Sequence, residues 1–282
     1  MRRLTSNKFV LVAVMSLAVA FCVSAGSVRQ AYAYHTSAAS AIVIERTTGR
    51  VLYEHNADER RPIASTTKIL TAITVIENTE DLDRSVVVPD AAIGTEGSSL
   101  YLEKGEKLRI IDLLYGLMLR SGNDCAVALA IVTSGDVKGF AALMNMTARR
   151  AGACDSRFVN PHGLPDEDHK STARDMALIS AYAMRNDVFR RIVSTKRYTE
   201  CPYADRGYNR DMTNKNKMLT MLDGATGIKT GYTKEAGRCL VSSASRDGKE
   251  VICVVLGCGP MFEESCAMIE EAFAKLSEET VG

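Results

Sequence analysis

The pattern of hydrophobic and polar positions divides the chain into an extended start, a helical middle and an extended end. Residues 41–44 and 51–53 are rich in β-forming side chains, and Thr47-Thr48-Gly49 between them predicts a hairpin turn. The stretches IKTGYT, RCLVSSAS and EVICVVLGC near the end are also β-rich, with Asp247-Gly248 as a turn signal between the last two. Strands at both ends with helices between them predict one α+β domain, whose N- and C-terminal strands form an antiparallel sheet of about five strands.

Apolar residues at helical spacing fill the region between the two sets of strands. Ile69, Leu70, Ile73 and Ile76 recur on one face of a predicted helix. The run CAVALAIV is apolar on all sides, so the helix it predicts should be buried. Further helices are predicted by LRIIDLLYGLML, VKGFAALMNMTARRAG, ARDMALISAYAMRN and FEESCAMIEEAFAKL, whereas FVNPHGLPDEDHKST predicts a loop. The sequence therefore predicts a cluster of helices beside the sheet.

The N-terminus has the three-part pattern of a secretory signal peptide. A basic segment, MRRLTSNK, precedes the uncharged apolar run FVLVAVMSLAVAFCVSAG, and the small-x-small sequence Ala31-Tyr32-Ala33 follows. We expect residues 1–33 to be a signal peptide cleaved after Ala33, with Val23-Ser24-Ala25 as the second choice, and the exported protein to comprise residues 34–282. The alternative is an uncleaved anchor, because the apolar run is nearly long enough to span a membrane.

Composition adds limits on function. The 282 residues are 46% hydrophobic and 24% charged, with a net charge of +1, so charge gives no reason to expect nucleic acid or an anionic membrane as a partner. Seven of the eight cysteines follow the signal segment, without a C-x-x-C pair, and the chain has four histidines, so no metal site is expected. An exported protein could form one disulfide, but the spacing does not select its partners.

Three short motifs carry the candidate chemistry. Ser65-Thr66-Thr67-Lys68 places a serine and a lysine one helical turn apart, where the amine could act as the base of a serine nucleophile. Alone, this motif would be an ordinary capped helix start. Ser121-Gly122-Asn123 would alone be a helix N-terminus, and Lys229-Thr230-Gly231 an edge strand guarded by a lysine. Their occurrence together, once each and in this order, is what indicates a catalytic site.

S-x-x-K, an S-D-N element and K-T-G form the signature of penicillin-binding proteins and class A β-lactamases. With S-G-N in the middle, and with NPHGLP, ARDMAL and GIKTGYT, the chain resembles the low-molecular-weight penicillin-binding proteins, the serine D-alanyl-D-alanine carboxypeptidases of peptidase family S11. The resemblance implies a β-lactamase/transpeptidase-like fold. It also implies removal of the terminal D-alanine from peptidoglycan pentapeptide stems in cell-wall biogenesis, covalent inhibition by β-lactams, and no cofactor or metal.

The resemblance also implies roles for particular residues. Ser65 is the expected nucleophile, Lys68 its general base with a pKa lowered by burial or by Lys229, and Ser121 a proton relay to the leaving amine. The remaining expected site residues hold the substrate or form the oxyanion hole; they are Asn123, Lys229, Thr230, Gly231, Tyr232 (through its N–H) and His162, which could equally be a turn histidine.

Two other functions compete with this interpretation. A class A-like β-lactamase would need a carboxylate for deacylation, but the E-x-x-L-N element is missing and residues 166–168 occur in a carboxypeptidase-like loop. A catalytically silent cell-wall-binding protein would have no chemical reason to keep Lys68. The sequence also leaves open whether the protein acts as a carboxypeptidase, a transpeptidase or an endopeptidase, because these reactions share the acyl-enzyme.

The acidic C-terminal segment MIEEAFAKLSEETVG is a poor membrane anchor, so we expect no C-terminal anchor and no further β-domain.

Overall fold

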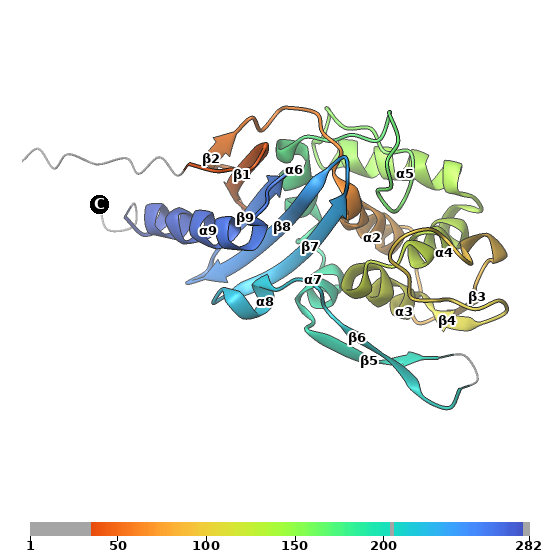
Figure 1. Ribbon diagram of the computed structural model, residues 1–282. Coiled ribbons are helices and arrows are strands. Elements are labelled where there is room, and N and C mark those ends of the chain that lie inside the picture. The colour runs from red at the N-terminus through yellow and green to blue at the C-terminus, as the bar shows by residue number, and fades with distance from the viewer. Residues whose placement is uncertain (1–34, 204–205, 279–282) are drawn as a thin grey trace, which may run out of the picture. The chain divides into compact units, whose positions relative to one another are not determined.

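Five strands form one antiparallel sheet in the order β2-β1-β9-β8-β7 (Figure 1). Their bounds are β1 Ser40–Glu45, β2 Val51–His55, β7 Ala225–Thr233, β8 Gly237–Arg246 and β9 Lys249–Leu256. β1 pairs with β9 along its whole length, so the N-terminal hairpin joins the C-terminal strands and the predicted α+β sheet is confirmed. Asp247 and Gly248 have positive φ values of 50° and 76°, the type I′ geometry of a two-residue turn between β8 and β9.

The computed structural model describes residues 35–203 and 206–278. The predicted signal peptide, residues 1–33, lies outside these ranges, so its cleavage stays a prediction. The elements described below all belong to the unit Thr36–Gly282.

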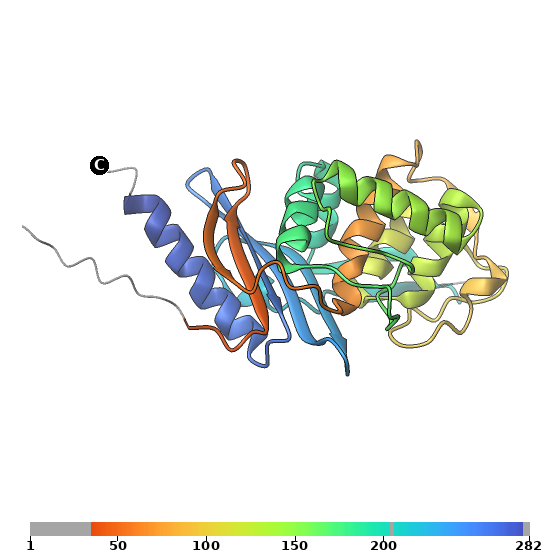
Figure 2. The same ribbon diagram turned by 90° about the horizontal axis from the view of Figure 1, so that it is seen from above.

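Helices cover both faces of the sheet (Figure 2). α9 packs on one face against β8, β9 and β2, whereas α6 and α7 pack on the other face together with the rest of the helical cluster. The helices are α2 Lys68–Glu77, α3 Ile110–Tyr115, α4 Asn123–Ser134, α5 Val137–Arg150, α6 Ala173–Ala183, α7 Asp187–Ser194, α8 Met218–Met221 and α9 Met261–Glu278, with short 3-10 turns η1 Ala64–Thr67 and η2 Asp90–Ala92 and the π-helical turn η3 Gly116–Arg120.

Burial from both sides explains the apolar sequence of the central strand. Every residue of β9 after Lys249 is buried, as expected of a strand with helices on both faces. α2 is also more enclosed than its one-sided apolar pattern predicts, since every residue from Lys68 to Ile76 is buried among α4, α5, α6 and α7. The buried hydroxyl of Thr71 is satisfied by donating to the carbonyl of Pro161, 2.7 Å away.

Two small hairpins extend from the helical cluster (Figure 1). They pair β3 Ser85–Val87 with β4 Lys107–Arg109 and β5 Arg197–Pro202 with β6 Asn209–Thr213. The second hairpin is fixed by tertiary contacts: the ring of Tyr198 stacks on Tyr115 with centroids 3.8 Å apart, and Arg210 forms a buried ion pair with Glu106.

The described residues also bear on membranes, metals and disulfides. Within 35–203 and 206–278 no single helix is long and apolar enough to cross a membrane, although α4 and α5, which meet at an 87° bend, pass the same test as a pair. The same residues contain no group of three or more His, Cys, Asp or Glu side chains that could hold a metal ion. All seven cysteines after the signal segment are free thiols.

Candidate active site

Ser65 and Lys68 meet at the junction of η1 and α2, which places the predicted nucleophile in a 3-10 turn rather than in the first α-helical turn. The Nζ of Lys68 donates to Ser65 Oγ at 2.9 Å, to Asn123 Oδ1 at 2.6 Å and to the main-chain carbonyl of His162 at 2.8 Å. Two of the three acceptors, the amide oxygen and the carbonyl, cannot donate in return. A neutral Lys68 amine would keep these two bonds with its two N–H groups and direct its lone pair at the Ser65 hydroxyl.

The surroundings of Lys68 favour this neutral form. The side chain is fully buried, and burial, followed by the nearby charge of Lys229, lowers the pKa of Lys68 well below its ordinary value. Lys229 is 1% exposed and donates from Nζ to the carbonyl of Thr230 at 2.9 Å. Burial and the charge of Lys215 lower the pKa of Lys229 to about 7. The charges of Lys229 and Lys215 both act on Lys68 and add to the effect of burial, which favours the neutral amine.

The S-G-N motif brings an amide to Lys68 at the start of α4. Asn123 Nδ2 donates to the carbonyl of Glu96 at 2.5 Å, which fixes the side chain so that Oδ1 faces Lys68. Ser121 is buried and has left-handed backbone angles, φ 63° and ψ 32°, which are uncommon for a residue other than glycine. Among the residues described, the Ser121 hydroxyl has no hydrogen-bond partner, so it is available to a ligand or a transferred proton.

The loop that carries NPHGLP closes against η1. Gly163 has φ +86°, and a Cβ at this position would lie 1.9 Å from the carbonyl oxygen of Ala64, so only glycine fits. His162 contributes its main-chain carbonyl to Lys68, while its ring Nδ1 accepts from the N–H of Leu164 at 3.1 Å. The sequence left open whether His162 belongs to the site or is a turn histidine. Its ring takes part in the turn, whereas its main-chain carbonyl contacts Lys68 in the site.

His169, which the sequence analysis did not select, supports the same turn from behind. Its Nδ1 accepts from the N–H of Val159 at 3.2 Å, so the proton lies on Nε2, which faces Thr67 Oγ1 at 2.8 Å; Thr67 in turn donates to the Ala64 carbonyl. Burial lowers the pKa of His169 to about 4 and that of His162 to about 3, so both rings are neutral at physiological pH.

The K-T-G strand forms the opposite wall. β7 is an edge strand, and a Cβ on Gly231 would lie 2.9 Å from the main-chain nitrogen of Ser65, so glycine lets the strand approach the nucleophile closely. Lys229 and Gly231 alternate with Thr230 and Tyr232 along the strand, and the Tyr232 side chain is 66% exposed. The structure thus places β7 beside Ser65, with main-chain groups on its outer edge for an extended peptide.

The comparisons with known proteins agree with this geometry. A family model described as D-alanyl-D-alanine carboxypeptidase, peptidase S11, matches residues 27–259, and the chain belongs to this family. The D-alanyl-D-alanine carboxypeptidase DacF of Bacillus subtilis is 32% identical over 282 residues, which cover 98% of this chain and 72% of that protein. The D-alanyl-D-alanine carboxypeptidase of Streptomyces sp. (strain K15) is 39% identical over 223 residues, covering 74% of this chain and 77% of the relative.

Solved structures show the same fold. The crystal structure of the Streptomyces (strain K15) DD-transpeptidase superposes with a TM-score of 0.79 at 35% identity, over 86% of this chain and 98% of that one. The D-alanyl-D-alanine carboxypeptidase DacD of Francisella tularensis gives a TM-score of 0.79 at 29% identity, over 86% and 71% of the two chains. The β-lactamase/transpeptidase-like fold expected from the motifs is therefore confirmed.

Proposed function

We propose that this protein is a serine D-alanyl-D-alanine carboxypeptidase that removes the terminal D-alanine from peptidoglycan pentapeptide stems and is acylated by β-lactams. The observation that carries the proposal is the contact of a fully buried lysine amine with the Ser65 hydroxyl, beside the edge strand β7. Family membership supports the same reaction. We further propose that residues 34–282 form the catalytic domain and act outside the cytoplasm after export.

In the proposed reaction, neutral Lys68 takes the proton of the Ser65 hydroxyl as Oγ attacks the carbonyl carbon of the penultimate D-alanine. The developing oxyanion is stabilised by the N–H groups of Ser65 and Tyr232. The peptide bond breaks, and the departing amine of the last D-alanine receives a proton through Ser121. Water then hydrolyses the acyl-enzyme and restores the Ser65 hydroxyl.

The charges of Lys229 and Lys215 attract the free carboxylate of the substrate in this proposal. Lys229 supplies the nearest charge, with Thr230 beside it, and Lys215 adds a charge that the motifs did not indicate. Asn123 has a second N–H on Nδ2, beyond the one given to Glu96, for a carbonyl of the stem peptide. No cofactor or metal is needed by this chemistry.

Two observations argue against the competing functions. The three hydrogen bonds of Lys68 include no carboxylate. Two of the three loop acids engage elsewhere: Asp166 accepts from the N–H of Asp168, and the Asp168 carboxylate pairs with Arg157. A β-lactamase of class A needs a carboxylate at the acyl-enzyme, so rapid deacylation is not supported. A silent binding protein would not need a buried lysine, whose desolvation is costly.

The proposal predicts that the purified protein releases D-alanine from a synthetic stem pentapeptide, with a tetrapeptide as the second product. Mass spectrometry of the products, with and without an added amino-acid acceptor, separates hydrolysis from transfer to an amine. Intact pentapeptide after prolonged incubation with folded protein would contradict the carboxypeptidase function.

The lysine pKa values predict the pH dependence of kcat/KM for acylation. The rate should rise with pH through the depressed pKa of Lys68, because only the neutral amine is a base. It should fall as pH passes about 7, where Lys229 loses the proton that attracts the carboxylate. Lys68 and Lys229 interact, so the rising and falling limbs of the pH profile give apparent pKa values of the pair rather than of either residue. A stopped-flow profile of β-lactam acylation that rises without a falling limb up to pH 10 would contradict this assignment.

A further inference from the structure

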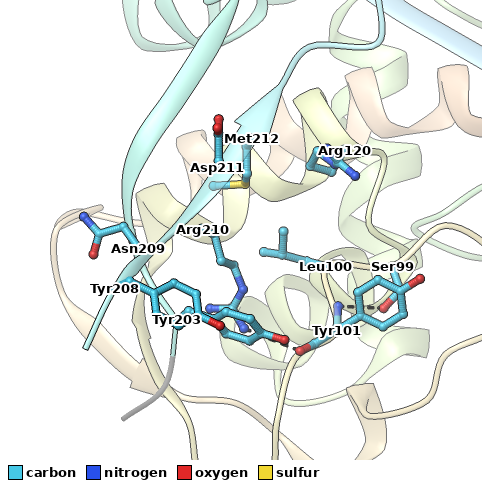
Figure 3. A pocket seen from close by; sticks show the side chains of 10 residues that line it. All are labelled: Ser99, Leu100, Tyr101, Arg120, Tyr203, Tyr208, Asn209, Arg210, Asp211 and Met212. Atoms are coloured by element: carbon cyan, nitrogen blue, oxygen red, sulfur yellow. Dashed lines mark hydrogen bonds between the residues drawn. The ribbon is translucent and has the colours of Figure 1, made fainter. Parts of the chain in front are cut away.

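A pocket of about 320 Å³ lies beside the S-G-N turn, outside the residues assigned to the reaction (Figure 3). Two of its lining residues adjoin the active site in sequence. Arg120 directly precedes Ser121, and Ser99 follows Ser98, whose carbonyl accepts from the N–H of Asn123 at 2.7 Å. The Ser99 hydroxyl donates to Asp124 at 2.6 Å, so the loop that borders the pocket is fastened to the start of α4.

Ion pairs join the two sides of the pocket. Arg210 on β6 forms a buried ion pair with Glu106, at 2.6 Å, and donates to the carbonyl of Tyr101 at 3.4 Å. Its guanidinium lies 4.1 Å from the centroid of the Tyr203 ring. Arg206 forms an ion pair with Glu103 at 2.7 Å, which also links the two sides of the pocket. The buried Arg210–Glu106 pair holds this part of the wall in place, which reduces the conformational freedom lost when a ligand enters.

Tyrosine side chains line this pocket from both sides. Figure 3 shows Tyr101 on one side and Tyr203 and Tyr208 on the other, with Leu100 between them. Tyr101 is 74% exposed and Tyr208 is 57% exposed, so both rings are accessible to a ligand. Tyr101 also has a positive φ of 58°, a conformation that a bulky side chain rarely adopts and that costs free energy. An exposed ring on a strained backbone is the observation that motivates a binding role for Tyr101.

Two of the three charged side chains that line the pocket are paired. Arg210 is neutralised by Glu106. Asp211 pairs with Arg197, and the charge of Arg120 adds to the effect of Arg197 in lowering the pKa of Asp211. The remaining polar groups at the rim, such as the amide of Asn209, can donate and accept hydrogen bonds. The tyrosine side chains offer apolar ring faces with polar groups around them. A ligand ring that is apolar on its faces and carries hydroxyl groups at its edges would complement this surface.

We propose that this pocket binds an N-acetylhexosamine ring of the glycan strand to which the stem peptide is attached. This inference rests on the proposed function, because it assigns the sugar part of the same substrate. The four residues of the acyl part of a stem peptide span about 14 Å when extended. The hydrogen bonds from Lys68 to Ser65 and Asn123, and from the Asn123 N–H to the Ser98 carbonyl, link the nucleophile to the loop that borders the pocket.

The test compares D-alanine release from a free pentapeptide with release from the same peptide attached to N-acetylglucosaminyl-N-acetylmuramic acid. The disaccharide should raise kcat/KM by about tenfold in the unaltered protein. Tyr208→Ala and Tyr101→Asn should each bring the ratio close to one; asparagine is chosen because it tolerates the positive φ of Tyr101. Met146→Ala, an equally exposed apolar residue on α5, is the control and should keep the ratio.

A ratio near one in the unaltered protein, or a ratio that survives both tyrosine substitutions, would overturn the sugar site while leaving the carboxypeptidase function intact. Binding of the disaccharide without a peptide, measured by saturation-transfer NMR, tests the site separately from catalysis. The signal should be present in the unaltered protein and lost in Tyr208→Ala. If neither pentapeptide is cleaved but this signal behaves as expected, the reaction is wrong and the sugar site stands.

Discussion

Replacing Lys68 with methionine should lower the rate at which benzylpenicillin acylates the protein by about 10³-fold, the usual contribution of a positioned general base. Methionine has a similar length and is tolerated in a buried position, but it has no lone pair to accept the proton of Ser65. The loss should therefore exceed anything caused by a change in packing. The measurement is the acylation rate from stopped-flow or time-resolved intact mass.

Lys138→Met is the matched control for this substitution. Lys138 lies exposed on α5, so its replacement should leave acylation unchanged. Circular dichroism should show that both variants are folded, since the Lys68 variant also leaves two oxygen acceptors, on Asn123 and His162, without their donor. Near-normal acylation of a folded Lys68→Met protein would mean that another group removes the proton.

The second large effect is expected for Gly163→Ala. A methyl group at this position would lie 1.9 Å from the Ala64 carbonyl oxygen and 2.8 Å from Thr67 Oγ1, in addition to a φ of +86°. Overpacking and the left-handed backbone together should reduce the free energy of unfolding by about 3 kcal/mol. Acylation should also slow, because the displaced loop carries the His162 carbonyl that holds Lys68. Denaturant unfolding and the acylation rate are the two measurements.

Gly49→Ala separates the effect of the left-handed backbone from the effect of the steric clash. Gly49 has a similar φ of +73°, but a Cβ there would meet nothing within 4 Å. This control should lose only about 1–2 kcal/mol from the backbone conformation and acylate normally. If Gly163→Ala costs no more than Gly49→Ala, the close contact between the loop and η1 does not constrain the site.

The sequence predicted the sheet well because its strands carry strong local signals. The apolar run in β9 and the Asp247-Gly248 turn are typical of a buried hairpin, and the structure confirms both. The hairpin of β5 and β6 was missed, because its sequence is polar and its stability comes from contacts with distant residues, such as Tyr198 on Tyr115. α7 was missed as well, although Asn186 caps it by accepting from the N–H of Phe189.

The site was predictable in its motifs but not in its supports. Nothing in the sequence shows that the His162 carbonyl, rather than its ring, would bind Lys68, or that His169 would brace η1 from more than 100 residues away. Lys215 stands outside every motif, and only the folded chain brings its charge near Lys229. Such contacts depend on how loops close, which local patterns do not determine. The roles assigned to the motif residues remain predictions for the experiments proposed above.

The most direct test of the central claim, that Ser65 is a nucleophile activated by Lys68, is intact-mass spectrometry after incubation with benzylpenicillin. The account predicts a lasting adduct of one penicillin per protein, located on Ser65 by peptide mapping and absent from Ser65→Ala. Rapid hydrolysis of penicillin without a lasting adduct would indicate a β-lactamase instead. An adduct of equal yield in Ser65→Ala, or no reaction in folded protein, would contradict the account.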